Sequence, residues 1–284
     1  MTENSTAQNA SRPLAGLNAW VTGSSRGLGR VMAEELCRLG ARVAVHGTRE
    51  DSPKTFGEGE SMQQVASDIA AACNGETLPV WGNLIDENEV ARIAAEIRDK
   101  WGQIDLLVCC AGGDIGAAGT GVGKGGRPEN DDCLNIALDD LQSVMDRNLT
   151  TAILCCREVA PEMQQRKSGR IITIGSIAGL YGRESGSIYA VAKAAVHEYT
   201  RCLAAQLRPD NVTVNCVAPG GTVTERFLRI HEIDDDRLIE SGTLDRYGRP
   251  HEIASVVGFL CRPESGFISG QVIRVDGGGQ TFPC

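Results

Sequence analysis

Apolar and polar positions follow two alternating patterns along the chain. Short apolar runs predict buried strands, and longer stretches with apolar residues three and four positions apart predict helices. The expected strands are Ala19–Thr22, Arg42–His46, Leu78–Trp81, Leu106–Cys110, Arg170–Ile174, Thr213–Val217 and Val272–Val275. The expected helices cover about 28–39, 61–73, 87–101, 138–166, 188–207 and 250–261.

This alternation of strands and helices predicts an α/β fold, a doubly wound parallel sheet of about seven strands with helices on both faces. The 284 residues can bury one large core, so we expect a single domain at 14–284. Residues 1–13 are polar and lack the charged start and apolar core of a secretory signal, so we expect a disordered leader there.

Composition excludes several classes of partner. The net charge is −9 and there is no basic stripe, which argues against nucleic acid and anionic membranes. No apolar run approaches the ~20 residues that span a bilayer. The eleven cysteines and four histidines show no metal-ligand spacing, so we expect no metal site. We expect reduced thiols and a cytoplasmic protein.

A glycine-rich turn follows the first predicted strand. Gly23, Gly27 and Gly29 form the pattern T-G-x-x-x-G-x-G just before a predicted helix. Glycines let the backbone approach a phosphate closely, and a helix N-terminus offers free N–H groups and a positive dipole end. Ordinary turns also use glycine, but the flanking strand and helix favour a nucleotide-binding turn.

The residues after the second strand bear on the choice of cofactor. Thr48 and Arg49 stand where an acidic residue would bind a ribose 2′-hydroxyl, and Arg26 lies inside the glycine turn. Guanidiniums and a hydroxyl can converge on a 2′-phosphate, so we expect NADP(H), with NAD(H) as the alternative. Glu50 would favour NAD(H) if its carboxylate pointed into the pocket. Both arginines could instead be solvated surface.

Tyr189 and Lys193 are the strongest candidates for chemistry. They stand four apart in a run with helical periodicity, so their side chains share one face. A cation beside a phenol favours the phenolate, and such a tyrosine can give a proton to a carbonyl oxygen or take one from an alcohol. The same spacing is also common on exposed helices.

Taken together, these motifs resemble the classical short-chain dehydrogenase/reductase family over nearly the whole chain, from Leu17 to Gly279. The matching stretches are TGSSRGLG at 22–29, Asn148 in DRNLTTAILCC, Ser176 in RIITIGSIAG, YAVAK at 189–193, VNCVAPGGTVT at 214–224, and the late GRPHEIA and GQVIRVDGGG segments. Ser176 precedes Tyr189 by 13 residues, which is the family's spacing. The resemblance implies a Rossmann fold that binds NAD(P).

The resemblance also implies roles for individual residues. Tyr189 would be the general acid/base, and Ser176 would bind the substrate oxygen. Lys193 would hold the nicotinamide ribose and support the tyrosine. Asn148 would interrupt its helix and hold a water that links Lys193 to solvent. Thr224 would contact the nicotinamide carboxamide.

Local structure offers other roles for three of these residues. Ser176 could cap a strand end, Asn148 could be a polar residue inside a helix, and Thr224 could be a helix N-cap.

The resemblance implies a wider set of cofactor contacts. These are Gly23, Ser25, Arg26, Gly27, Leu28, Gly29, Thr48, Arg49, Asn83, Leu84, Ala111, Gly112, Tyr189, Lys193, Pro219, Gly220, Thr222 and Thr224.

Two positions depart from the family pattern. Cys110 replaces the Asn of the usual Asn-Ala-Gly after the fourth strand, and we expect it to pack there instead. Asn83 replaces the usual Asp after the third strand, and its amide oxygen can still accept a hydrogen bond from an adenine amino group.

Three segments stand apart from the regular pattern. Residues 50–60 lengthen one connection, and the glycine-rich 112–137 either overhangs the substrate pocket or is a tolerated surface insertion. Residues 222–247 match the family's substrate lid, and their many charges favour a polar or charged substrate.

These observations predict an oxidoreductase that transfers hydride between NADP(H) and a small-molecule carbonyl/secondary-alcohol pair, similar to 3-oxoacyl-acyl-carrier-protein reductases. A sugar or polyol dehydrogenase of the same family is the first alternative. A non-catalytic nucleotide-sensing protein on this fold is the second. The family resemblance implies a homotetramer, or a homodimer, built through the helices containing Asn148 and Tyr189. These helices are apolar on more than one face, which fits burial against a partner subunit.

Overall fold

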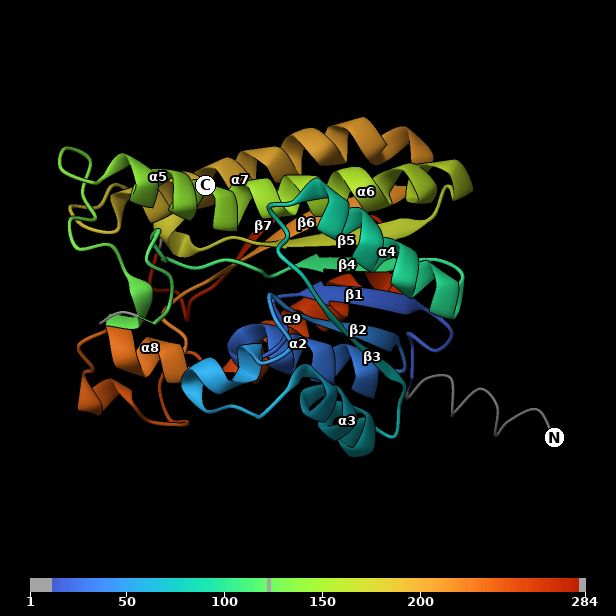
Figure 1. Ribbon diagram of the computed structural model, residues 1–284, viewed down its shortest axis with the longest axis horizontal. Helices are drawn as coiled ribbons and strands as arrows, with labels where there is room; N and C mark the ends of the chain where they lie inside the picture. The colour runs from blue at the N-terminus through green and yellow to red at the C-terminus, as the bar shows by residue number, and fades with distance from the viewer. Residues whose placement is uncertain (1–11, 122–123, 281–284) are drawn as a thin grey trace.

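The computed structural model describes residues 12–121 and 124–280, and the leader predicted at 1–13 lies outside them except for Arg12 and Pro13. The described residues form one seven-stranded sheet in the order β3-β2-β1-β4-β5-β6-β7 (Figure 1). Every pair of neighbouring strands is parallel. The strands are β1 Asn18–Thr22, β2 Arg42–Gly47, β3 Thr77–Trp81, β4 Leu106–Cys109, β5 Gly169–Ile174, β6 Val212–Pro219 and β7 Val272–Val275. The predicted doubly wound α/β fold is confirmed.

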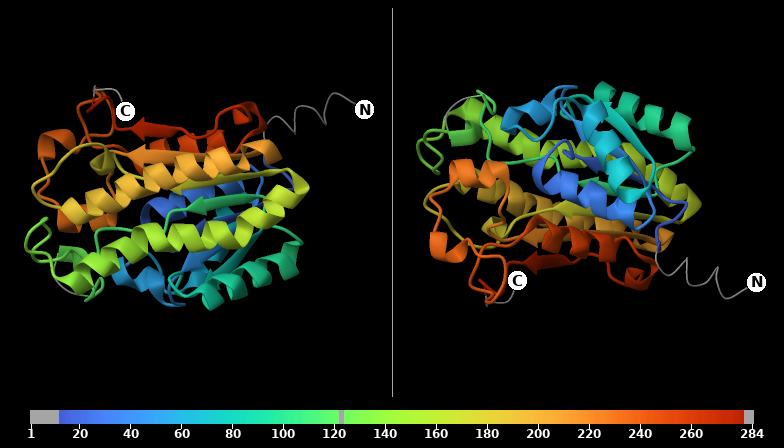
Figure 2. Two further views of the ribbon diagram at one scale, coloured as in Figure 1. Left: turned by 90° about the horizontal axis from the view of Figure 1, so that it is seen from above. Right: turned by 90° about the horizontal axis from the view of Figure 1, so that it is seen from below.

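Helices cover both faces of the sheet (Figures 1 and 2). One face carries α2 Gly27–Arg38, α3 Met62–Cys73 and α9 Pro250–Leu260. The other carries α4 Glu87–Trp101, α6 Thr151–Arg166 and α7 Ser187–Leu207. Two short helices, α5 Leu138–Met145 and α8 Glu225–Ile230, lie beyond the carboxyl ends of the strands (Figure 1). Within the described ranges, no helix is both long and apolar enough to cross a membrane.

Strand β1 shows how the sheet separates two cores. Successive side chains on a strand point to opposite faces. Trp20 is completely buried in the core shared with α4, α6 and α7, and Val21 is completely buried in the core shared with α2, α3 and α9. The sheet is therefore covered on both sides, which leaves the ends of the strands as the place for a ligand.

The helix predicted at 138–166 is interrupted at Asn148, as the family resemblance implied. Residues Asp146–Thr150 form a π-turn between α5 and α6. The Thr151 N–H donates to the carbonyl of Asp146, five residues back. The Asn148 side chain donates to the Val144 carbonyl at 2.8 Å, in place of a backbone N–H. Such π-turns are frequent at functional sites.

One strand ends earlier than predicted. Strand β4 stops at Cys109 instead of Cys110, because the next two backbone N–H groups turn toward β1. The N–H groups of Cys110 and Ala111 both donate to the Thr22 hydroxyl, each at 3.0 Å. This hydroxyl fixes the path of the chain as it leaves the sheet.

Candidate active site

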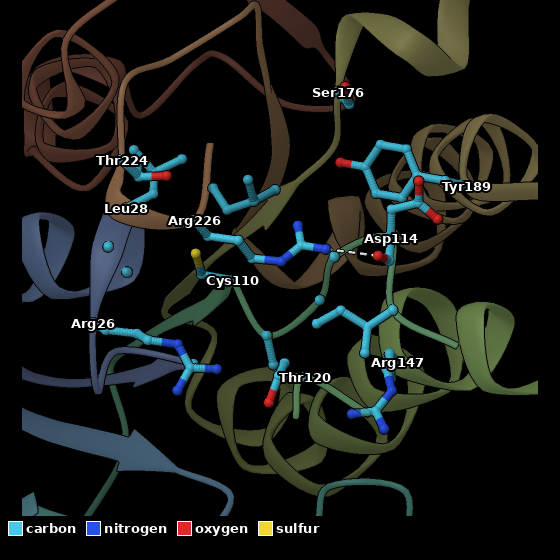
Figure 3. Close-up of a pocket in the computed structure, with 18 of the residues that line it drawn as sticks. Arg26, Leu28, Cys110, Asp114, Thr120, Arg147, Ser176, Tyr189, Thr224 and Arg226 are labelled. Carbon is cyan, nitrogen blue, oxygen red and sulfur yellow. Dashed lines mark hydrogen bonds between the residues drawn. The ribbon is translucent and has the colours of Figure 1, made fainter. Parts of the chain in front are cut away.

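A cavity of about 710 Å³ opens at the carboxyl ends of the strands (Figure 3). Its wall includes every predicted cofactor contact, together with Ser176, Tyr189 and Lys193. Asn148 lies behind this wall and is 1% exposed. The volume is in the range of small-molecule and cofactor sites. The structure therefore gathers residues from all parts of the sequence into one space.

The glycine turn is shaped by close contact with the chain after β4. Gly23 has φ +65, and a Cβ there would lie 2.7 Å from the Ala111 Cα. A side chain at this position would therefore force the two segments apart.

Sequence reasoning missed the role of His46 in supporting this turn. The Gly23 N–H donates to His46 Nδ1 at 3.1 Å, so the ring proton lies on Nε2, which donates to the Gly82 carbonyl at 3.1 Å. Burial lowers the pKa of His46 to about 4, which keeps the ring neutral. The imidazole thus connects the ends of β1, β2 and β3.

An acidic side chain occupies the N-terminus of α2. The Gly27 N–H donates to Glu58 Oε2 at 2.7 Å. Arg26 donates to the Ser52 carbonyl at 2.6 Å, and its guanidinium lies 5.0 Å from the centre of the Phe56 ring. These partners come from the 50–60 segment, which the sequence suggested was only a longer connection.

The residues of the turn fit a dinucleotide. The open glycine turn and the helix N-terminus supply N–H donors of the kind that bind phosphates. Glu58 shows that this N-terminus accepts an oxyanion, because its carboxylate already takes the Gly27 N–H. Arg49 lies at the rim, with its side chain 71% exposed and paired with Asp51 at 3.1 Å. Glu50, the residue that would have favoured NAD(H), does not line the cavity.

One face of α7 borders the end of the cavity that contains Ser176 and Tyr189. Tyr189, Lys193 and His197 stand four apart on it. The Lys193 ammonium donates to the Ile174 carbonyl at 2.8 Å and lies 5.6 Å from the centre of the Tyr189 ring. Since Lys193 is only 5% exposed, its charge acts on the phenol with little screening by water.

His197 was also missed, although its spacing of four from Lys193 was a usable signal. Its Nε2 accepts the Ser176 N–H at 3.4 Å. Burial lowers its pKa to about 4, with further contributions from Lys193 and Arg201, so the ring is a neutral acceptor. His197 therefore positions the backbone of Ser176 from behind.

For Ser176 and Thr224, the capping role and a place in the cavity wall coexist. The Ser176 hydroxyl accepts the Ala178 N–H at 3.1 Å, and the Thr224 hydroxyl accepts the Phe227 N–H at 3.1 Å at the start of α8. Both side chains also line the cavity. Each hydroxyl accepts one backbone hydrogen bond as a helix cap, and its own proton is still available for donation to a ligand.

Asn148 fixes the chain that passes between Lys193 and the cavity. Its Oδ1 accepts the Gly113 N–H at 3.0 Å, and its Nδ2 donates to the Gly113 carbonyl at 2.9 Å. A Cβ at Gly112 would lie 2.7 Å from Asn148 Oδ1 and 3.4 Å from Lys193 Nζ. The amide and the ammonium thus face the same glycine.

Cys110 packs against the core beside this chain, as expected for the residue that replaces the family's Asn. Burial raises the pKa of its thiol to about 11. The thiol is therefore neutral and serves as a small apolar side chain.

Two arginines of α8, in the 222–247 segment, bind the 112–137 and 50–60 segments. Arg226 donates to the carbonyls of Asp114 at 2.6 Å and Gly125 at 3.3 Å. Arg229 donates to the Phe56 carbonyl at 3.3 Å and lies 5.1 Å from the centre of that ring. The 112–137 segment overhangs the cavity, because Asp114, Thr120 and Arg127 all line it.

In the part of the chain that the structure describes, no three His, Cys, Asp or Glu side chains cluster in a way that could hold a metal ion.

Comparison with known proteins places the chain in a family. A family model described as Enoyl-(Acyl carrier protein) reductase matches residues 23–280. Cyclohexanol dehydrogenase of Rhodococcus sp. (strain TK6) is 36% identical over 94% of this chain and 97% of that protein. The 3-oxoacyl-[acyl-carrier-protein] reductase of Synechocystis sp. is 33% identical over 93% of this chain and 97% of that protein.

A solved structure shares the fold over nearly its full length. The 7α-hydroxysteroid dehydrogenase complexed with NADH and 7-oxo glycochenodeoxycholic acid is 26% identical, with a TM-score of 0.80 over 95% of this chain and 96% of that chain. The sequence motifs, the parallel sheet and these relatives agree with one another. The chain therefore belongs to the classical short-chain dehydrogenase/reductase family and is a nicotinamide-dependent oxidoreductase of alcohol and carbonyl groups.

Proposed function

We propose that this enzyme transfers hydride between NADP(H) and the carbonyl/secondary-alcohol group of a small molecule, with Tyr189 as the general acid/base. The main support is the geometry of one cavity. It joins the glycine turn to Ser176 and Tyr189, and the Lys193 ammonium lies 5.6 Å from the Tyr189 ring. A purely structural role would not require a buried ammonium beside a tyrosine ring in the same cavity as the glycine turn.

The chain's own residues account for the handling of the proton. When bound, the nicotinamide supplies or accepts the hydride. In the reducing direction Tyr189 donates its proton to the carbonyl oxygen, while the Ser176 hydroxyl donates a hydrogen bond to the same oxygen. The Lys193 ammonium stabilises the negative charge left on the phenol oxygen. In the oxidising direction the same groups act in reverse.

The two arginines near the adenosine end support NADP(H), and two acidic groups oppose them. Arg26 and Arg49 line the cavity and can bind a 2′-phosphate. Glu58 lies at the Gly27 N–H and Asp51 pairs with Arg49, so both reduce the local positive charge. We propose NADP(H) as the preferred cofactor and NAD(H) as a weaker one.

The printed names of the relatives support more than one substrate class. They include a cyclohexanol dehydrogenase, 3-oxoacyl-acyl-carrier-protein reductases and a 2,3-dihydroxy-2,3-dihydro-p-cumate dehydrogenase. A solved neighbour at 30% identity is a putative gluconate dehydrogenase. Reduction of a 3-oxoacyl-like ketone is our first candidate, and oxidation of a sugar or polyol is the second.

A nucleotide sensor that does no chemistry is the alternative from another class. A sensor would not need Ser176, Tyr189, Lys193 and Asn148 together, so their joint presence favours an enzyme.

Oxidation of NADPH with a panel of ketones separates the enzyme from the sensor. The panel should contain a cyclic ketone, a 3-oxoacyl thioester and a ketose, each tested also in the oxidising direction with the matching alcohol. Turnover of any member supports the enzyme. Tight NADPH binding together with a complete lack of turnover across the panel would favour the sensor.

We also propose that the protein is a cytoplasmic homotetramer, or a homodimer, built through α5–α6 and α7. Val191 on α7 is 52% exposed and Leu138 at the start of α5 is 79% exposed, so apolar side chains lie on the outer surface of this layer. The described cysteines are all free, which suits a reducing compartment. Light scattering that finds a monomer would contradict the assembly.

A further inference from the structure

The substrate end of the cavity is rich in positive charge, although the whole chain has a net charge of −9. Setting aside the groups near the cofactor turn and the proton-transfer residues, its charged lining residues are Arg127, Arg147, Arg183, Arg226, Asp114 and Asp146. Arginine therefore outnumbers carboxylate there. The charge of this cavity wall is opposite in sign to the net charge of the protein. It is therefore a local property of the site, which the composition does not predict.

Three of these arginines converge near the catalytic face of α7. A Cβ at Gly186, just before α7, would lie 3.1 Å from Arg127 Nη2 and 3.5 Å from Arg183 Cζ. Arg226 approaches the same space from α8, and Figure 3 shows its guanidinium and the Tyr189 hydroxyl pointing into the centre of the cavity. The three side chains come from the 112–137 loop, the loop before α7 and the lid.

Two of the three arginines have no carboxylate partner among the described residues. Arg183 and Arg226 make no ion pair there. The hydrogen bonds of the Arg226 guanidinium go to the carbonyl oxygens of Asp114 and Gly125. Arg127 pairs through Nε with Asp114 at 2.9 Å and with Asp131 at 3.3 Å.

The local acids do not cancel this charge. Burial, followed by the neighbouring Asp131 carboxyl, raises the pKa of Asp114 to about 7, so Asp114 carries only part of a negative charge near neutral pH. Burial, followed by the charges of Arg127, Arg183 and Arg226, lowers the pKa of His231 on the lid. The space that His231 faces is therefore electropositive.

We propose that Arg127, Arg183 and Arg226 form a carboxylate-binding subsite beside Tyr189, and that the substrate is an oxo acid or the corresponding hydroxy acid. The inference rests on the proposed hydride transfer, and it names an oxo acid as the substrate class in place of the 3-oxoacyl thioester or the neutral sugar. A planar carboxylate matches the paired N–H groups of a guanidinium, and partial burial strengthens that contact. Binding at the arginines fixes one end of the substrate while its carbonyl reaches Tyr189 and Ser176.

Matched pairs of acid and ester test this subsite. The probes are 4-oxocyclohexanecarboxylate, 4-oxopentanoate and 5-oxohexanoate, each beside its methyl ester, with cyclohexanone as the neutral reference. The proposal expects kcat/KM for at least one acid to exceed that for its ester by about 10-fold. Each ester keeps the ketone and the carbon skeleton of the acid, replaces the charged carboxylate by a neutral ester and adds one methyl group.

The variant Arg183→Gln links the preference to the cluster. It should reduce the ratio of acid to ester by about 10-fold, mainly through KM for the acid. Arg38→Gln is the matched control, because Arg38 is exposed at the end of α2, outside the cavity wall, in a surface pair with Glu35. Circular dichroism and NADPH binding show whether each variant is folded.

The remaining outcomes overturn the proposal in distinguishable ways. Equal or better use of the esters, or turnover of cyclohexanone alone, excludes a carboxylate subsite while leaving the proposed reaction intact. If Arg183→Gln still prefers the acid over its ester to the same extent, this arginine cluster is not the carboxylate-binding subsite. Absence of turnover with every probe and with the wider ketone panel defeats the proposed function, and this inference falls with it.

Discussion

The carboxylate of Glu58 accepts the backbone N–H of Gly27 at 2.7 Å, at the first residue of α2. A carboxylate is stabilised at a helix N-terminus by about 0.3–1 kcal/mol. The same N–H groups are the natural donors for a phosphate of the cofactor. We therefore expect Glu58 to compete with the cofactor for this turn, and to compete most strongly with the cofactor that carries more negative charge.

Glu58→Gln should tighten the binding of both dinucleotides, and NADPH more than NADH. Removing one negative charge near the phosphates should lower the Kd for NADPH about 5-fold and that for NADH about 2-fold. Titration of the fluorescence of each reduced cofactor measures both values. Glu60→Gln is the control, because Glu60 is exposed on the same loop and pairs with Lys54. An unchanged Kd for NADPH would contradict this prediction, because it would show that the Glu58 carboxylate does not oppose cofactor binding.

Arg49→Ala tests the proposed preference for NADP(H). The Arg49 side chain is 71% exposed, so water screens its charge and the expected loss is modest. We expect the Kd for NADPH to rise about 5-fold, with less than about a 2-fold change for NADH. An equal loss for both cofactors would indicate that the 2′-phosphate is held elsewhere.

Tyr189→Phe should remove turnover while the protein still binds its cofactor. The substitution deletes only the hydroxyl that carries the proton, so kcat should fall at least about 1000-fold. Binding of NADPH should stay within a few-fold, because the rest of the cavity is intact. Activity close to that of the wild type would refute the role assigned to this residue.

His197 is expected to act on the reaction through Ser176. His197→Ala removes the acceptor for the Ser176 N–H, so kcat should fall about 10-fold with little change in the Kd for NADPH. His197→Gln offers an amide oxygen at a similar reach and should recover most of the loss. If alanine and glutamine behave alike, the ring only fills space.

The burial of His46 predicts a loss of stability in acid. The pKa is 6.5 in the unfolded chain and about 4 in the folded protein. Above pH 6.5 the His46 imidazole is neutral in both the folded and the unfolded protein, so it adds no pH dependence to the free energy of unfolding. Between pH 6.5 and 4 only the unfolded state takes up the proton, so the free energy of unfolding falls by about 1.4 kcal/mol per pH unit.

His46→Asn isolates this contribution. Its amide oxygen can still accept the Gly23 N–H, but it does not titrate in this range. Urea unfolding at several pH values should show a slope smaller by about one proton between pH 6 and 4.5. His251→Asn, at an exposed position in α9, is the matched control. Equal slopes for wild type and His46→Asn would mean that His46 is protonated in the folded state.

The parts of the site that could be predicted from the sequence are those with local geometry. Tyr189 and Lys193 share a face because a helix repeats every 3.6 residues, and the same rule places His197 on that face. Gly23, Gly27 and Gly29 define a turn because strand and helix flank them directly. The alternation of strands and helices was sufficient for the parallel sheet.

Other parts were decided only by the tertiary structure. Glu58 reaches Gly27 across 31 positions of sequence, and Arg226 reaches Asp114 across 112. The loops that carry Glu58 and Asp114 have no periodic pattern, so neither strand alternation nor helical spacing fixes where a side chain points. Their paths are set by packing against distant elements, namely α2 and α8. For this protein the sequence determined the fold, the family and the candidate proton-transfer residues. The tertiary structure decided which charges line the cavity, because those charges come from loops that only long-range contacts place.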